Sequence, residues 1–127
     1  MDVRALALAA VVVLAACDRL PRESSAREQA MTMTGANPDD GPPLMRHYGC
    51  ISCHTIPGVR GADATVGPPL TAMARRTFIA GVLPNTPTNM VRWIVNPPAV
   101  DSLTAMPYLG VTAADARRMA AYLYTLR

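Results

Sequence analysis

The residues best suited to chemistry stand together in the stretch Cys50-Ile51-Ser52-Cys53-His54. The spacing Cys-x-x-Cys-His is the attachment signature of a c-type haem. Two thiols separated in this way lie on neighbouring faces of one helical turn, so both can reach vinyl groups on the same edge of a porphyrin. The adjacent His54 then lies under the macrocycle with a ring nitrogen free to bind iron. The motif predicts one covalently attached haem c, held by Cys50 and Cys53 and ligated by His54.

The same cysteine pair could serve a structural zinc site or a thioredoxin-like redox pair. A structural zinc ion needs four ligands, and the further candidates are Cys17 and His47. A thioredoxin-like pair stands in a βαβ unit, whereas no strand-rich segment surrounds this motif. The context favours haem over both alternatives.

A second axial ligand has to come from a segment far from His54, because other parts of the chain cover the opposite face of a haem. Met106 stands in the loop from Thr104 to Gly110, where no apolar helix stripe explains it, and Pro107 stiffens the segment. His47 is a rival ligand, but its place on the expected first helix favours a surface position. The other methionines fit less well, because one lies close to the attachment site and three occupy apolar helix positions typical of core filling: Met45, Met73, Met90 and Met119.

The N-terminus has the features of an export signal. Arg4 precedes an unbroken run of Ala, Leu and Val from Ala5 to Ala16, which is too short to span a bilayer and fits a secretory signal. The run ends in Leu14-Ala15-Ala16-Cys17, which resembles the lipobox of bacterial lipoproteins, where the cysteine is acylated and anchors the chain to a membrane. We therefore expect a signal peptide over residues 1–16 and a lipid on Cys17. A buried core helix, or a free thiol after ordinary cleavage, are the alternatives.

The segment after Cys17 is polar. Residues 17–38 are rich in Arg, Glu, Ser and Thr and show no sustained apolar period, which predicts a flexible tether with a reach of roughly 25 Å. The globular domain is expected over residues 39–127. All 12 basic residues are Arg, the formal net charge is +3, and there is no basic run, so no nucleic-acid partner is expected. The pairs Arg75-Arg76 and Arg117-Arg118 are interpreted as solvated helix faces.

The elements that must position the motif are predicted to be helices. The first is expected from Pro43 to Tyr48, a loop over 56–70 follows, and a short helix over 71–80 comes next. Thr86 and Pro87 begin a further helix that stops at Asn96-Pro97. Thr112, with Asp115 as its capping-box partner, opens the last helix. This helix carries one apolar stripe, made of Ala116, Met119, Ala120, Leu123 and Leu126.

The prediction is an all-α domain without strands. With few aromatic residues its apolar core is thin, and a large flat cofactor at the centre would complete it. We therefore expect the chain without haem to be poorly folded.

Several further elements resemble a class I cytochrome c. They are Gly67-Pro68-Pro69-Leu70 after the haem motif, a helix that ends in Asn96-Pro97, Met106-Pro107 in a loop, and the closing helix. The resemblance covers residues 39–127 and implies a small cytochrome c fold of about four helices wrapped around one covalent haem. It also implies Met106 as the distal iron ligand and a Pro68 carbonyl that accepts a hydrogen bond from the His54 ring.

A narrower resemblance lies in the stretch Gly81–Pro87 and in Arg92-Trp93-Ile94. These residues are similar to cytochromes that serve, or are fused to, subunit II of haem–copper oxidases. Trp93 and Tyr108 are expected either to pack against haem or bind a propionate, or to be ordinary core and surface aromatics.

The resemblance implies an electron carrier and not an enzyme, since His54 and Met106 together leave no open iron site. It would move single electrons in a respiratory chain, from a quinol-oxidising complex or a dehydrogenase towards a terminal oxidase. A lipid on Cys17 would hold it on the periplasmic side of a bacterial inner membrane. The alternatives are a fixed subunit of a larger oxidoreductase complex, a haem-based sensor of small ligands, and a non-haem metal or structural lipoprotein that uses the cysteine pair.

Overall fold

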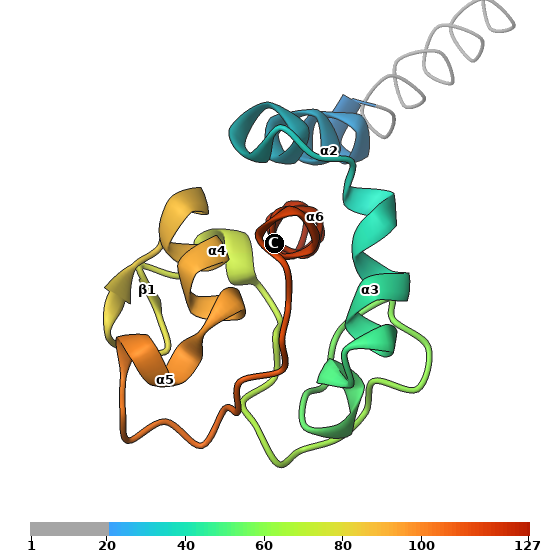
Figure 1. The fold of residues 1–127 in the computed structure, drawn as a ribbon. Helices are drawn as coiled ribbons and strands as arrows, with labels where there is room; N and C mark the ends of the chain where they lie inside the picture. The colour runs from blue at the N-terminus through green and yellow to red at the C-terminus, as the bar shows by residue number, and fades with distance from the viewer. Residues whose placement is uncertain (1–20) are drawn as a thin grey trace, which may run out of the picture.

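Helix α6, Ala113–Leu123, lies at the centre of the computed structural model, which describes residues 21–127 (Figure 1). Three helices contact it: α2 (Pro21–Thr34), α3 (Gly41–His47) and α4 (Pro87–Val95). The expected signal peptide and Cys17 lie outside the described residues. Within residues 21–127, no helix combines the length and the apolar character needed to cross a membrane.

Both long helices of the domain begin where the sequence predicts. The Thr112 side chain accepts a hydrogen bond of 3.1 Å from the Asp115 N–H at the start of α6. The Thr86 side chain accepts one of 3.2 Å from the Asn89 N–H at the start of α4, with proline in the first turn. These caps satisfy backbone donors that a helix leaves unpaired at its N-terminus.

Helix α4 ends at Asn96, as expected, but a further short helix follows at once. Asn96 accepts a 3.2 Å hydrogen bond from the Ala99 N–H and so caps α5, Pro97–Val100. Proline stops the preceding helix because it lacks a donor, yet it is favoured in the first turn of the next one. Pro97 does both.

Helix α3 crosses α6 at close range. It follows a 3-10 turn, η1 (Pro38–Asp40), and begins at Gly41, two residues earlier than predicted. A Cβ atom at Gly41 would lie 2.4 Å from Cβ of Tyr122 and 3.1 Å from the backbone oxygen of Arg118. The absence of a side chain at this position therefore lets the two helices touch.

The prediction of a helix over residues 71–80 is wrong. Only a 3-10 turn forms there, η3 (Met73–Arg75), and it is followed by an antiparallel hairpin of β1 (Phe78–Ile79) and β2 (Leu83–Pro84). Aromatic and β-branched residues favour a strand, and Gly81, at φ 75°, favours the turn between the strands. The fold is mostly α with one short hairpin.

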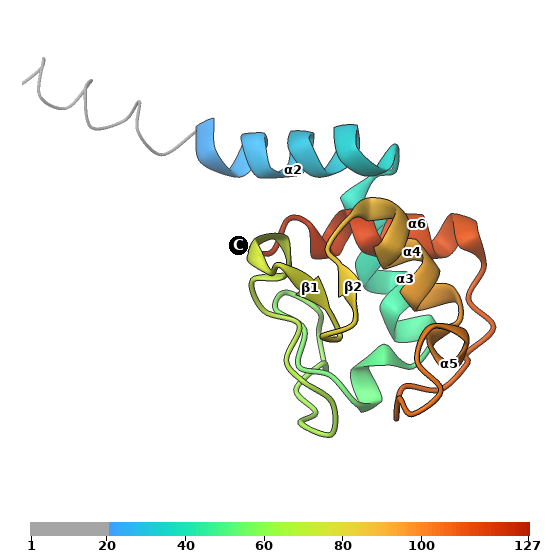
Figure 2. The same cartoon turned by 90° about the vertical axis from the view of Figure 1, so that its left-hand side faces the viewer.

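The flexible coil expected before the domain is replaced by helix α2 from Pro21 to Thr34. Ala26, Ala30 and Thr34 are 8%, 1% and 8% exposed, and α2 packs on α6 above the rest of the domain (Figure 2). Arg27 forms an ion pair with Asp39. Small residues four positions apart give no strong apolar pattern in the sequence, and the contact with α6 explains why this segment is helical.

Candidate functional site

A cavity of about 840 Å³ brings the predicted site residues together. Cys50, Cys53, His54 and Met106 all line it, although half of the domain separates Met106 from the others in sequence. In Figure 1 the turn η2, Cys50–Ser52, and the chain that follows α5 lie on opposite sides of the lower half of the molecule. The volume falls within the range of about 300–1,000 Å³ that is usual for small-molecule and cofactor sites.

The walls of the cavity are mostly apolar. Helices α4 and α6 and the hairpin supply many of the lining residues, including Ile79, Met90, Trp93, Met119 and Leu123. A ligand that fills the cavity removes these apolar walls from water, which contributes about 25 cal/mol per Å² of apolar surface buried. The cavity therefore fits a large apolar ligand, and a porphyrin held by Cys50 and Cys53 meets that requirement.

The cysteine pair sits at one wall as two free thiols. Gly49, at φ 77°, precedes η2, and the Cys53 and His54 N–H groups both donate to the Cys50 carbonyl, over 3.3 and 3.0 Å. This tight turn places the two sulfurs and the imidazole on one cavity. Burial raises the pKa of the Cys50 thiol, so the thiol form is favoured at neutral pH.

The His54 ring is oriented by a backbone carbonyl. Its Nδ1 lies 2.7 Å from the Pro68 oxygen, and because a carbonyl only accepts, Nδ1–H is the donor. In the neutral ring, Nε2 then keeps its lone pair for a metal. The expected hydrogen bond between these residues is present. Gly67 makes room for the ring, since a Cβ atom there would lie 2.6 Å from Cε1 and 2.8 Å from Nδ1.

Met106 lies on the loop after α5 and is partly buried. Its N–H donates a 3.2 Å hydrogen bond to Thr104 Oγ1, and the next residue, Pro107, also lines the cavity. The four other candidate methionines line the same cavity but differ from Met106 in being no more than 4% exposed, within the packed core: Met45, Met73, Met90 and Met119. Their burial agrees with the core-filling role expected for Met73, Met90 and Met119.

Trp93, Tyr108 and His47 differ in where they lie relative to the cavity. Trp93 is 8% exposed and lines the cavity, whereas Tyr108 is 62% exposed and does not. Tyr108 turns to solvent because its two neighbours on the loop, Pro107 and Leu109, face the cavity. His47 is exposed at the end of α3 and does not line the cavity, so the structure gives no support to it as an iron ligand.

Arg76 is a site residue that the sequence analysis missed. It was interpreted as part of a solvated pair, but it is half-buried and lines the cavity. Its guanidinium donates to the Thr71 carbonyl over 3.0 Å, which holds it beside the Gly67–Leu70 segment. A cation at the edge of an otherwise apolar cavity is suited to a carboxylate of its ligand. In the sequence, the only hint of this position is that Arg76 follows the Gly-Pro-Pro-Leu element at a distance of a few residues.

Tyr48, another lining residue, connects the cavity to α6. Its hydroxyl donates to Asp115 Oδ2 over 2.8 Å, and the Thr112 hydroxyl donates to the same oxygen over 2.9 Å. These hydrogen bonds, and then Arg118, hold the pKa of Asp115 below its usual value. The Asp115 carboxylate raises the pKa of Tyr48 in turn. A charged carboxylate thus fixes the Tyr48 ring against the cavity.

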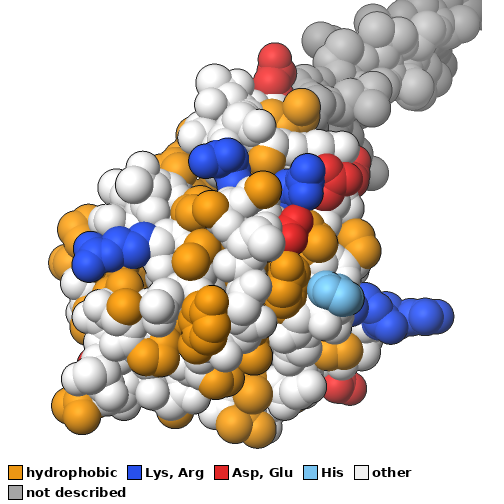
Figure 3. All heavy atoms as spheres, viewed as in Figure 1, with side chains coloured by type: hydrophobic (Ala, Val, Ile, Leu, Met, Phe, Trp, Pro, Cys, Tyr) orange, Lys and Arg blue, Asp and Glu red, His pale blue; other side chains and the backbone are white. Residues whose placement is uncertain are grey.

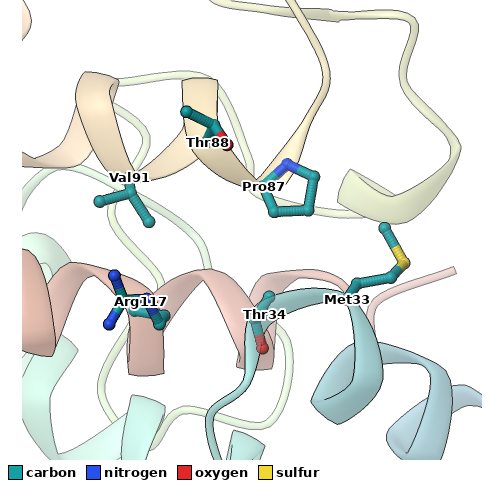
Figure 4. Close-up of a pocket in the computed structure, with 6 residues that line it drawn as sticks. All are labelled: Met33, Thr34, Pro87, Thr88, Val91 and Arg117. Atoms are coloured by element: carbon teal, nitrogen blue, oxygen red, sulfur yellow. The ribbon is translucent and has the colours of Figure 1, made fainter.

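The rest of residues 21–127 offers no comparable site. No three His, Cys, Asp or Glu side chains in this range form a group that could hold a metal ion. A second, smaller cavity of about 200 Å³ lies between the end of α2, the start of α4 and α6, and Figure 4 shows Met33, Val91 and Arg117 around it.

The comparison with known proteins finds a similar protein, a subunit of a cytochrome c oxidase. Over 104 residues, or 81% of this chain, the sequence is 33% identical to cytochrome c oxidase subunit 2 of Alkalihalophilus pseudofirmus. The match covers 29% of that protein, so the chain spans less than a third of its relative's length. No family model and no solved structure matches the chain. This similarity supports the expected link to haem–copper oxidases. Membership of the class I cytochromes c stays a prediction.

Proposed function

We propose that the protein is a monohaem c-type cytochrome that carries single electrons in a respiratory chain. One observation carries the proposal: Cys50, Cys53, His54 and Met106 line a single cavity whose volume and apolar walls suit a porphyrin. The similarity to a cytochrome c oxidase subunit supports a role close to a terminal oxidase.

The chain's own residues would divide the work of holding the cofactor. Bound there, haem c would supply a one-electron Fe(III)/Fe(II) couple. Cys50 and Cys53 would each add a thiol across a vinyl group, so the cofactor could not dissociate. Pro68 fixes the ring of His54 with Nε2 free to bind, and Met106 would supply the second protein ligand. Two protein ligands leave no position for a substrate, which is why we propose a carrier and not an enzyme.

The environment of the cavity suits electron transfer. Its apolar walls exclude water, and this together with methionine ligation raises a haem potential. Exposed apolar side chains surround the opening, with Val66, Phe78 and Leu109 at 83%, 53% and 38% exposure. On the side of the molecule seen in Figure 3, the lower part carries many hydrophobic side chains and few charges. Such a surface suits brief contacts with a redox partner.

Location and partners follow from the N-terminus and from the relative. We propose a lipid anchor on Cys17 and a position on the periplasmic side of a bacterial inner membrane. Electrons would come from a quinol-oxidising complex or a dehydrogenase and pass to a terminal oxidase, in line with the oxidase subunit named in the comparison.

The Met106→Ala variant tests the iron site. We expect the purified variant to keep its covalent haem but to lose the methionine–iron charge-transfer band and to fall strongly in potential. Met90→Ala is the matched control, because Met90 lines the same cavity from the core of α4. An unchanged band in Met106→Ala, or rapid binding of carbon monoxide by the reduced wild type, would reject the closed site and favour the sensor. A wild-type protein without a covalent haem spectrum would reject the proposal as a whole.

A second candidate role is a fixed subunit of an oxidase complex. The specific support is that the relative is itself an oxidase subunit. Purification in mild detergent separates the two roles, since a fixed subunit stays with its complex through size exclusion and a mobile carrier elutes alone.

A further inference from the structure

Helix α2 stands between the expected lipid anchor and the rest of the domain. We propose that α2 is a rigid mount that holds the opening of the cavity away from the membrane, so that the redox partner meets it from the aqueous side. This inference rests on the proposed lipidation of Cys17. In this proposal the domain has a defined orientation on the membrane instead of rotating freely on a flexible tether.

The first argument is that α2 is fixed to the domain over residues 26–34. Ala30 is 1% exposed and belongs to the same packed core as Met119 of α6. The ion pair between Arg27 and Asp39 joins α2 to η1, and Arg127 donates a hydrogen bond to Gln29. Contacts with both the first turn of the domain and its last residue leave α2 little freedom to rotate.

The second argument is that α2 and the cavity lie on opposite sides of α6. Met119 and Leu123 line the cavity, and residues two positions away from them on a helix point in nearly the opposite direction. Ala121 is such a residue, and it is 0% exposed. A helix with the cavity on one side and solvent on the other would expose Ala121. Figure 1 shows α2 packed on the side of α6 that faces away from the lower half of the molecule, and this packing contributes to the burial of α6 on that side.

The third argument is one of chain length. Pro21 follows Cys17 by four residues, which span at most about 14 Å when fully extended. A domain of this size is about 30 Å across. If the opening faced the membrane, α2 on the far side would stand farther from the bilayer than the linker can reach. The docked α2 therefore excludes that orientation.

The orientation can be measured with two fluorescent labels on the full-length, lipidated protein in vesicles that contain a lipid-attached quencher. Glu28→Cys places a label on the exposed surface of α2, and Leu103→Cys places one beside the cavity loop, where Leu103 is 92% exposed. We expect quenching of the Leu103 label to be several-fold weaker than quenching of the Glu28 label. Equal quenching of both labels, or stronger quenching at Leu103, would overturn the proposal.

A variant that detaches α2 gives an independent test. Ala30→Glu places a charge in the contact between α2 and α6, and we expect it to raise quenching of the Leu103 label while the haem spectrum stays unchanged. Thr32→Glu is the matched control, because Thr32 is exposed on the same helix, and it should leave quenching as in the wild type. If Ala30→Glu does not fold, the comparison of quenching at Glu28 and Leu103 in the protein without that substitution still tests the proposal.

Flotation of the vesicles separates the inference from its premise. A protein that does not float with the vesicles but shows a normal haem spectrum lacks the anchor, which rejects the lipidation and with it the mount. A protein that floats with equal quenching of both labels keeps its anchor and rejects the mount alone.

Discussion

Gly67 gives the sharpest test of how the fold presents His54. In Gly67→Ala the added Cβ would lie 2.6, 2.8 and 3.2 Å from three atoms of the imidazole ring, where ordinary contacts are about 3.5–4.0 Å. The ring has to move by about 1 Å, and the 2.7 Å hydrogen bond to Pro68 is lost. Overpacking and the lost bond together cost about 2–4 kcal/mol, or about 10 °C or more in the midpoint of thermal unfolding.

Two assays test this variant: thermal unfolding by circular dichroism, and the visible spectrum and potential of the protein with its proposed haem. We expect a lower midpoint together with altered ligation, since the displaced ring no longer holds Nε2 in place. Gly35→Ala is the control, because Gly35 has φ 67° and no atom within 4 Å of an added Cβ. The Gly35→Ala variant should lose about 1 kcal/mol in free energy of unfolding through backbone strain and keep a normal spectrum. A Gly67→Ala protein with an unchanged spectrum and midpoint would refute the close approach.

Three further substitutions test other parts of the structure. Asp115→Asn should lower the unfolding midpoint at pH 7. Because hydrogen bonds from Tyr48 and Thr112 lower the pKa of Asp115 from 3.8, the gap from wild type should close as the pH falls below about 4; a gap independent of pH would contradict this. Ala72→Gly should stabilise the protein by about 1 kcal/mol or less in urea unfolding, since Ala72 has φ 50°; a loss of stability would show that the backbone there is unstrained. Tyr124→Phe should cost about 1–3 kcal/mol, because it removes the 2.8 Å hydrogen bond to Asn85 Oδ1; a midpoint equal to wild type would refute that role.

The sequence predicts the local chemistry of this fold well. The caps at Thr86 and Thr112 depend on a side chain and a backbone group three residues apart, so a short stretch of chain specifies them. The cysteine pair and His54 are likewise one turn. The hydrogen bond from His54 to Pro68 was expected through the family resemblance, and it joins residues 14 apart across a single loop.

The parts that were missed depend on contacts between distant segments. Helix α2 has a weak apolar pattern, and only its packing on α6 makes Ala26 and Ala30 core residues. Arg76 could not be assigned to the cavity because the hairpin that carries the chain back was read as a helix. Tyr108 was placed by type and position, but which way a loop side chain turns depends on how its neighbours pack.

The central position of α6 has a consequence for how this protein can change during evolution. Ala116, Ala120 and Ala121 are all 0% exposed on a helix that is covered on several sides. A substitution that enlarges one of these residues would disturb the cavity, the contact with α2 or the crossing with α3, depending on the side of α6 that it faces. We expect variation among descendants of this chain to concentrate in exposed positions of α6 such as Ala114 and Arg117, with the alanines retained.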